Sequence, residues 1–333
     1  MTEHRPDDTP HPGRRKAIAG LAALSAAAAG LPARLLAATP APGAPDRPIT
    51  ILVGFAAGGS ADQIARNLAA AARDFSPVPV LVVNRPGAAG ALAAQAVAQA
   101  RPDGTTLFVG GGSETTSVGA HQTLPYDPLT SFRAIIKVAR LPSVLVVRAD
   151  SPYPDMKSLM AAARSAPEKL SYASTGQGGI FHSTGLVWEK VGGVKLLHVP
   201  YKGAAESMLA LMGSQVDMAF GAPDEVQAMV AAGKLRPIAI FSRSRLPAYP
   251  EVPTMTELGW PVAIDNMKGL LAPAGTPDAT AAWLFDTFRK AMETAEFQQY
   301  AKTSGLSLSF ADGPGFQREI SDSYTAIRKA IQS

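Results

Sequence analysis

The chain has 333 residues, of which 47% are hydrophobic and 17% charged, and this length suggests about two domains with a large buried core. It contains no cysteine, which excludes a disulfide framework, cysteine-ligated zinc and thiol catalysis. The net charge of +4 falls to +2 without residues 1–38, which hold five basic and three acidic residues, and no dense run of Lys and Arg remains. Nucleic acid is therefore not an expected partner.

Residues 1–38 have the pattern of a secretory signal peptide. A polar start leads to Arg14 and Arg15, and an Ala/Leu run follows. The paired arginines favour the twin-arginine route, although the residues after them lack the usual Phe, so the general secretory route stays open. A retained membrane anchor is the alternative, and Arg34 inside the run argues against it. We expect cleavage after Ala38 and a Pro/Ala linker over residues 39–47.

The first part of the mature chain predicts a strand, a glycine turn and a helix. The apolar residues 49–53 predict the strand, residues 54–59 the turn, and a helix begins near Ser60, which we assign as its N-cap, with Asp62 in its first turn. Free backbone N–H groups at such a helix start bind anions. The turn matches neither GxGxxG nor a Walker loop, so a purely steric role for its glycines is an equal alternative at this point.

Further units of the same kind follow. Strands are expected at 78–83 and 105–109, with a helix over 91–99 between them and a second glycine turn at 110–113. In parallel sheets, ligands bind beyond the carboxyl ends of the strands, and both glycine turns lie at such ends. Strands at 134–139 and 143–147 flank Pro142, which marks a crossing into a second domain.

The second half repeats this alternation. We expect strands at 170–174, 194–199, 216–220 and 235–241, and helices at 156–165, 182–191, 204–212 and 224–232. A strand at 269–273 returns to the first domain, and two helices, 277–294 and 313–331, close the chain. The prediction is a two-domain α/β protein in which each domain is a mostly parallel sheet flanked by helices. Domain I covers residues 48–140 and 266–333, domain II covers 141–265, and a hinged ligand cleft lies between them.

Six motifs in order resemble one protein family. They are residues 53–62 (VGFAAGGSAD), 82–90 (VVNRPGAAG), 102–107 (PDGTTL), 170–174 (LSYAS), 198–203 (HVPYKG) and 271–277 (LAPAGTP). The chain resembles the Bug-type, TctC-like substrate-binding receptors of tripartite tricarboxylate transporters over nearly all of residues 47–333.

The resemblance implies a fold, the two-domain, type II-like fold of periplasmic binding proteins, together with a function and a set of partners. It implies a soluble periplasmic receptor, expected as a monomer without cofactor or metal, which captures a small organic carboxylate. The receptor would deliver the carboxylate to a membrane permease of one large and one small subunit. Backbone N–H groups of the first glycine turn would hold one ligand carboxylate, and the second domain would close on the rest.

The resemblance also implies the ligand-binding residues. Carried over residue by residue, they come from the first glycine turn and from loops of the second domain: Phe55, Ala57, Gly58, Gly59, Ser60, Asp62, Ser174, Thr175, Gly176, Gln177, His182, Tyr201, Lys202, Gly203, Gly221 and Pro223. The chain departs from the family pattern at Ala56 and Ala61. It also departs at Lys268, which we interpret as a solvated surface lysine, with pairing to a second ligand carboxylate as the alternative.

Two other functions remain open. An exported receptor that passes ligand information to a sensor protein would have the same sequence features. A carboxylate-processing hydrolase would need a nucleophile and a base, but Ser60 is not in a GxSxG elbow, and no two histidines have helical metal-ligand spacing. We therefore expect no catalytic residue.

Overall fold

The computed structural model describes residues 42–264 and 266–332. The predicted signal peptide and its cleavage site lie outside these residues. Within them, no helix combines the length and the hydropathy that a membrane crossing requires.

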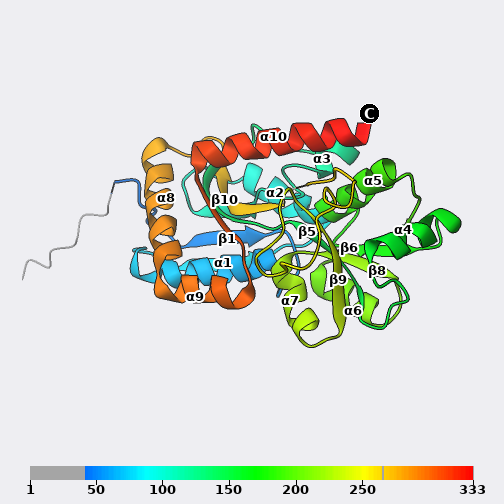
Figure 1. Cartoon of the computed structure of the whole chain (residues 1–333). Coiled ribbons are helices and arrows are strands. Elements are labelled where there is room, and N and C mark those ends of the chain that lie inside the picture. Colours follow the sequence, from blue (N-terminus) through cyan, green and yellow to red (C-terminus); the bar gives the residue numbers. More distant parts are fainter. Residues whose placement is uncertain (1–41, 265, 333) are drawn as a thin grey trace, which may run out of the picture. The chain divides into compact units, whose positions relative to one another are not determined.

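Two sheets divide the described residues into two lobes (Figure 1). The sheet of lobe I has the strand order β11-β4-β10-β3-β1-β2, and that of lobe II has the order β7-β6-β8-β5-β9. The strands of lobe I are β1 (Ile49–Val53), β2 (Val80–Asn84), β3 (Thr106–Gly110), β4 (Phe132–Arg140), β10 (Met267–Pro273) and β11 (Leu308–Asp312). Those of lobe II are β5 (Ser143–Arg148), β6 (Ser171–Ser174), β7 (Leu197–Pro200), β8 (Met218–Gly221) and β9 (Leu235–Phe241).

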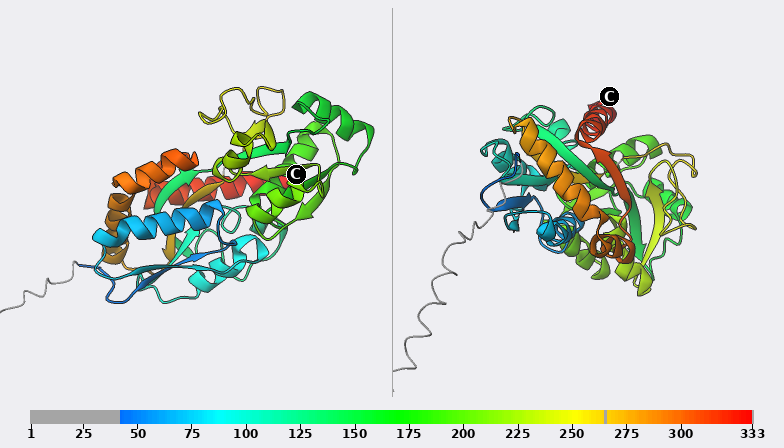
Figure 2. Two further views of the ribbon diagram at one scale, coloured as in Figure 1. Left: turned by 90° about the horizontal axis from the view of Figure 1, so that it is seen from below. Right: turned by 90° about the vertical axis from the view of Figure 1, so that its left-hand side faces the viewer.

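Helices flank both sheets (Figure 2). Lobe I carries α1 (Ser60–Ala71), α2 (Ala91–Ala98), α3 (Val118–His121), α8 (Asp278–Glu293), α9 (Ala295–Ser304) and α10 (Gly313–Gln332). Lobe II carries α4 (Met156–Ser165), α5 (Ile180–Gly192), α6 (Ala204–Met212) and α7 (Pro223–Ala231). The C-terminal helix α10 packs on β4 and also contacts α3 and α5, so it touches both lobes (Figure 1).

The two-domain α/β class is confirmed, but the sheets are mixed rather than mostly parallel. In lobe I, β1 pairs in parallel with β2 and β3, whereas the pairings of β10 with β3 and β4, and of β11 with β4, are antiparallel. In lobe II, β6 is parallel to β7 and β8, whereas β5 is antiparallel to β8 and β9. The strands next to the lobe crossings, β4, β5, β9 and β10, all have antiparallel partners, and β11 at the edge of lobe I is antiparallel as well. Strand β10, coming from lobe II, inserts between β3 and β4 and runs against both.

The hydrophobic pattern explains the core strands. The run Val144–Val147 in β5 is fully buried because β5 lies between β8 and β9 inside the sheet, as the continuous apolar stretch predicts. Strand β1 alternates between buried and partly buried residues, and Ile49, Ile51 and Val53 have no exposed surface. Because β1 and β5 are anchored in the core, they hold the sheets in place and with them the turns at the ends of the strands.

The expectation that only two helices close the chain is wrong. Helix α9 and strand β11 lie between α8 and α10. The side chain of Thr294 caps α9 by accepting a hydrogen bond from the Phe297 N–H, and Gly305 ends the helix in the left-handed conformation. The sequence carries both capping signals, but β11 is an edge strand with no apolar run of its own to reveal it.

Candidate functional site

The carboxyl ends of the parallel strands carry the glycine turns toward one small pocket between the lobes. Its lining comes from the turn after β1, from Ser113 after β3, from Thr175 after β6, and from the first residues of several helices. The lining residues are Phe55, Ala56, Gly59, Ser60, Ala61, Ser113, Thr175, Ile180, Phe181, Gly203, Ala204, Glu225, Asn266 and Lys268. The pocket volume of about 30 Å³ is close to that of one water molecule in the liquid, so the lobes are closed on each other.

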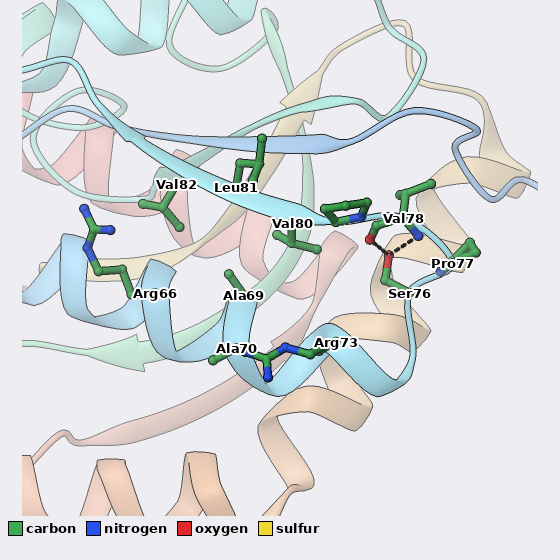
Figure 3. Close-up of a pocket in the computed structure, with 11 residues that line it drawn as sticks. Arg66, Ala69, Ala70, Arg73, Ser76, Pro77, Val78, Val80, Leu81 and Val82 are labelled. Atoms are coloured by element: carbon green, nitrogen blue, oxygen red, sulfur yellow. Dashed lines mark hydrogen bonds between the residues drawn. The ribbon is translucent and has the colours of Figure 1, made fainter. Parts of the chain in front are cut away.

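A larger groove lies elsewhere on lobe I. It has a volume of about 660 Å³ and runs between α1 and the edge strand β2, with Arg66, Arg73 and Ser76 on its walls (Figure 3). No helix begins in it and no glycine turn lines it. We place the candidate site in the smaller interlobe pocket because the polar groups without internal partners converge there.

The interlobe pocket has a positive electrostatic character that comes from the backbone. Helices α1, α5 and α6 begin at Ser60, Ile180 and Ala204, and all three residues line the pocket. The first N–H groups of a helix lack intrahelical acceptors, and the helix dipole adds a partial positive charge there. Three helix starts around one pocket therefore favour an anion.

A carboxylate of the protein already lies on one of these helix starts. The Ser60 N–H donates a hydrogen bond to Glu225 Oε1 at 3.3 Å, and the Ala222 N–H donates to Glu225 Oε2 at 2.9 Å. Glu225 belongs to α7 of lobe II, so this contact crosses between the lobes. The predicted N-cap role of Ser60 is wrong, since Gly59 is the N-cap and the buried Ser60 Oγ has no hydrogen-bond partner among the described residues.

Asp224, next to Glu225, is an unusual acid. Its Oδ1 is buried without a hydrogen-bond partner among the described residues. Burial, with a further contribution from the charge of Glu225, raises the pKa of Asp224 to about 7, and a contact with Ser60 acts in the opposite direction. The acidic pair at the start of α7 therefore carries less negative charge near neutral pH than its composition suggests.

Lys268 is the basic side chain of the pocket lining, and the surface interpretation of it is wrong. The residue is only 4% exposed, because β10 lies between two strands of the sheet. Its Nζ lies 5.3 Å from the centre of the Phe55 ring, which is within cation–π range. Neighbouring Asn266 is 6% exposed, and its Oδ1 has no hydrogen-bond partner among the described residues.

Asp62 lies outside the pocket lining and supports the first glycine turn. Its carboxylate accepts hydrogen bonds from the Gly58 N–H at 2.9 Å, from Asn84 Nδ2 at 2.9 Å and from Arg66 Nε at 3.0 Å. Burial works against ionisation, but the bonds from Arg66, Gly58 and Asn84 outweigh it and lower the pKa of Asp62. The carboxylate thus fixes the backbone of the turn.

The glycine turn at residues 175–179, which follows β6, is held by a stack of three histidine rings. His182 stacks on His198 with 4.0 Å between ring centres and on His121 of lobe I at 5.1 Å. The Gly178 N–H donates to His182 Nδ1 at 3.0 Å, and Ser174 Oγ lies 2.7 Å from His198 Nε2. Burial lowers the pKa of all three histidines. Burial and the charges of neighbouring histidines together lower the pKa to about 3 for His182 and about 4 for His198.

Direct contacts hold the lobes together beside the pocket. The Ile180 N–H donates to Ser113 Oγ at 2.9 Å, and Ser117 Oγ donates to the Gly178 carbonyl at 3.0 Å. His121 Nε2 lies 2.9 Å from Ser183 Oγ. The glycine turn at 110–113 therefore meets the glycine turn at 175–179 across the lobe boundary.

The structure brings only part of the sequence-predicted set to the pocket. Phe55, Gly59, Ser60, Thr175 and Gly203 line it. The others lie beside it: Ala57, Gly58, Asp62, Ser174, Gly176, Gln177, His182, Tyr201, Lys202, Gly221 and Pro223. Ala57, Gly58, Gln177 and Lys202 are exposed, whereas Asp62, Ser174 and His182 make internal hydrogen bonds. A ligand-binding role for any of the set stays a prediction.

Some lining residues were not in that set. Ser113 follows a glycine turn, which is a signal that the sequence provides, and Ile180 and Phe181 open a helix after another such turn. Glu225 and Asn266 carry no local signal. Among the described residues, no cluster of three or more His, Asp or Glu side chains is arranged to hold a metal ion.

Comparison with known proteins gives one consistent family. The model of the tripartite tricarboxylate transporter family receptor matches residues 64–333. A protein encoded in the gbd 5′ region of Cupriavidus necator is 37% identical over 293 residues, which are 85% of each chain.

Solved structures of this kind have the same fold. The periplasmic binding protein BugD superposes with a TM-score of 0.81 at 30% identity, over 86% of this chain and 97% of BugD. MatC of Rhodopseudomonas palustris, solved with bound malate, superposes with a TM-score of 0.80 at 26% identity, over 86% of this chain and 99% of MatC.

Proposed function

The chain belongs to the tripartite tricarboxylate transporter receptor family, and from this premise we propose that it captures a small organic carboxylate and delivers it to a permease. The observation that carries the proposal is the interlobe pocket, in which three helix starts and the buried Lys268 converge. Malate bound to the related MatC supports an organic acid as the ligand class.

The proposed mechanism is capture without chemistry. The pocket of about 30 Å³ is too small for an organic acid, so the lobes open to admit the ligand and close on it. A ligand shifts this equilibrium only through contacts that it makes better in the closed form. The N–H groups at the start of α1 in lobe I and of α5 and α6 in lobe II provide such contacts, because only closure brings them together.

The remaining parts of the proposal concern location and partners. We propose export by the signal peptide of residues 1–38 through the twin-arginine route, and a monomeric receptor in the periplasm. The partner is a permease of one large and one small subunit. The domains are residues 48–140 with 266–333, and residues 141–265. Sheet membership supports these boundaries, because it changes between Arg140 and Ser143 and again between Phe241 and Met267.

A thermal-shift screen of the purified protein tests this function. Mono-, di- and tricarboxylates, amino acids and aromatic acids are compared, with glucose as the uncharged control. A ligand at 100 times its Kd stabilises the protein by about 2.7 kcal/mol, which corresponds to a rise in Tm of roughly 4 °C for a chain of this size. If no acid raises the Tm above that of the glucose sample, the proposed function is wrong.

A further inference from the structure

We infer that Lys268 is the residue that recognises a second acidic group on the ligand, and that it makes the receptor selective for dianions over monoanions. This inference rests on the proposed function and names the side chain that sets the ligand class. It concerns a position where Lys stands between Met267 and Gly269 at the start of β10.

The first support is the burial of an unpaired cation. Lys268 lines the pocket and is 4% exposed, and no carboxylate of the described residues lies within 4.0 Å of its Nζ. The other buried lysine, Lys137, forms an ion pair with Glu319. A buried ammonium group without a counter-ion carries a desolvation cost, and an anion that enters the pocket would relieve it.

The second support comes from the residues that surround the head group of Lys268. Its Nζ and Asn266 Oδ1 both lie over Gly112, where a β-carbon would collide with each of them. Other polar side chains anchor this turn. Glu114 Oε1 accepts the Gly112 N–H at 2.9 Å, while Glu114 Oε2 has no partner among the described residues, and Thr116 Oγ1 donates to the Gly112 carbonyl at 2.6 Å. Glycine at position 112 thus leaves room for the lysine head group at the pocket wall.

The third support is the position of Lys268 relative to the helix starts. The N–H groups at the start of α1 serve one acid group of the ligand, and Lys268 belongs to the same pocket lining as Ser60, with its Nζ 5.3 Å from the centre of the Phe55 ring. The pocket then offers both the backbone N–H donors at the start of α1 and the positive charge of Lys268. A ligand with two acid groups uses both, whereas a monoacid leaves one of them unpaired.

Paired titrations test the inference. Calorimetry compares succinate with butyrate, and glutarate with valerate, on wild type and on Lys268→Met, which keeps the side-chain length without the charge. A charge-assisted hydrogen bond predicts a loss of about 10- to 100-fold in affinity for the two dicarboxylates. The monocarboxylates should stay within about threefold. Lys268→Arg should retain most of the preference for the dicarboxylates.

The controls separate three outcomes. Lys234→Met removes the same charge from an exposed position on lobe II and should change neither affinity. If Lys268→Met weakens mono- and dicarboxylates equally, or weakens neither, Lys268 does not read the second acid group, although the proposed function stands. If wild type binds none of the four acids and no acid in the thermal-shift screen, the proposed function fails and this inference fails with it.

The geometry points independently to Glu225 as an internal carboxylate that occupies the anion position and competes with the ligand. Glu225 Oε1 accepts the Ser60 N–H, and a β-carbon on Gly59 would lie 3.5 Å from the same oxygen. The Ala222 N–H holds the other oxygen. A ligand carboxylate at the start of α1 would need the same N–H group and would meet a like charge, so Glu225 has to move aside.

Glu225→Gln tests the competition because it keeps the size of the side chain and removes its charge. We expect succinate to bind about 5- to 10-fold more tightly to this variant in calorimetry at pH 7.5. Glu251→Gln, an exposed carboxylate of lobe II, is the matched control and should bind as wild type does. Unchanged or weaker binding to Glu225→Gln would overturn the competition, and weaker binding would indicate that Glu225 accepts a hydrogen bond from the ligand.

Discussion

Replacing Gly59 with leucine is expected to weaken carboxylate binding at least 100-fold while the protein keeps its fold. Gly59 has an extended backbone (φ −80°, ψ 170°), which any residue adopts, so the substitution introduces no backbone strain. A β-carbon at this position lies in ordinary contact with Glu225 Oε1, 3.5 Å away. The remaining leucine atoms exceed a pocket of about 30 Å³ and would occupy the start of α1.

A graded series checks this prediction. Gly59→Ala should bind succinate only moderately less well than wild type, and Gly59→Leu should show no measurable heat. Gly233→Leu adds the same side chain to an exposed turn of lobe II with open space around it, so this variant should retain binding. Its free energy of unfolding should fall by about 1 kcal/mol, because residue 233 has a positive φ that a leucine adopts with strain. Urea unfolding monitors the fold of each variant. Full binding by a folded Gly59→Leu protein would move the site away from the first glycine turn.

Local sequence patterns were sufficient to predict most of the fold. The strand–glycine–helix units at β1–α1 and β6–α5 have short-range signals, because apolar runs, glycine turns and helix periods are all set within about 20 residues. The direction of the strands was harder to predict. The position of β10 between β3 and β4 depends on a contact between segments more than 120 residues apart, and no local pattern encodes it.

The pocket residues divide in the same way into those with a local sequence signal and those placed by contacts between distant segments. The resemblance to the receptor family implied Gly59, Ser60 and Thr175 as site residues, and all three lie in glycine turns or helix starts at strand ends and line the pocket. Lys268 was read as a surface residue because lysines mostly are, and its burial follows from the insertion of β10. Glu225 reaches the pocket through a hydrogen bond to a residue 165 positions away. Side chains that cross between lobes depend on tertiary structure that a single sequence does not display.

The histidine stack predicts a loss of stability at mildly acidic pH. His182 and His198 titrate near 6.5 in the unfolded chain but at about 3 and about 4 in the folded protein. Between the folded and the unfolded pKa values, the unfolded state therefore binds more protons than the folded state. The contribution of the two neutral imidazoles to the free energy of unfolding is complete above pH 6.5 and is lost as the pH falls toward the folded pKa. At pH 5.0 each imidazole costs the folded state about 2 kcal/mol relative to pH 7.5.

Asp224 opposes this effect and has to be separated from it. Its folded pKa of about 7 lies above the unfolded value of 3.8, so the folded state gains a proton, and stability, as the pH falls below 7. By pH 5.0 this gain is about 2.5 kcal/mol. Asp62 and Glu319 have lowered pKa values and lose their contributions only below their unfolded values of 3.8 and 4.5. Together, His182, His198 and Asp224 therefore give a net loss of about 1 to 2 kcal/mol between pH 7.5 and 5.0. The lowered pKa of His121 adds to this loss, and the raised pKa of Glu189 opposes it.

Two substitutions isolate the imidazoles. In His182→Asn the side-chain oxygen replaces Nδ1 as acceptor for the Gly178 N–H, and in His198→Gln the amide replaces Nε2 beside Ser174 Oγ. The double variant should have no acid-induced loss from these sites. Its change in the free energy of unfolding from pH 7.5 to 5.0 should therefore be about 4 kcal/mol more favourable than that of wild type. Urea unfolding at both pH values measures the difference. Because Asp224 is present in both proteins, its contribution cancels, and an equal pH dependence would mean that the stacked rings have the same pKa in the folded and unfolded states.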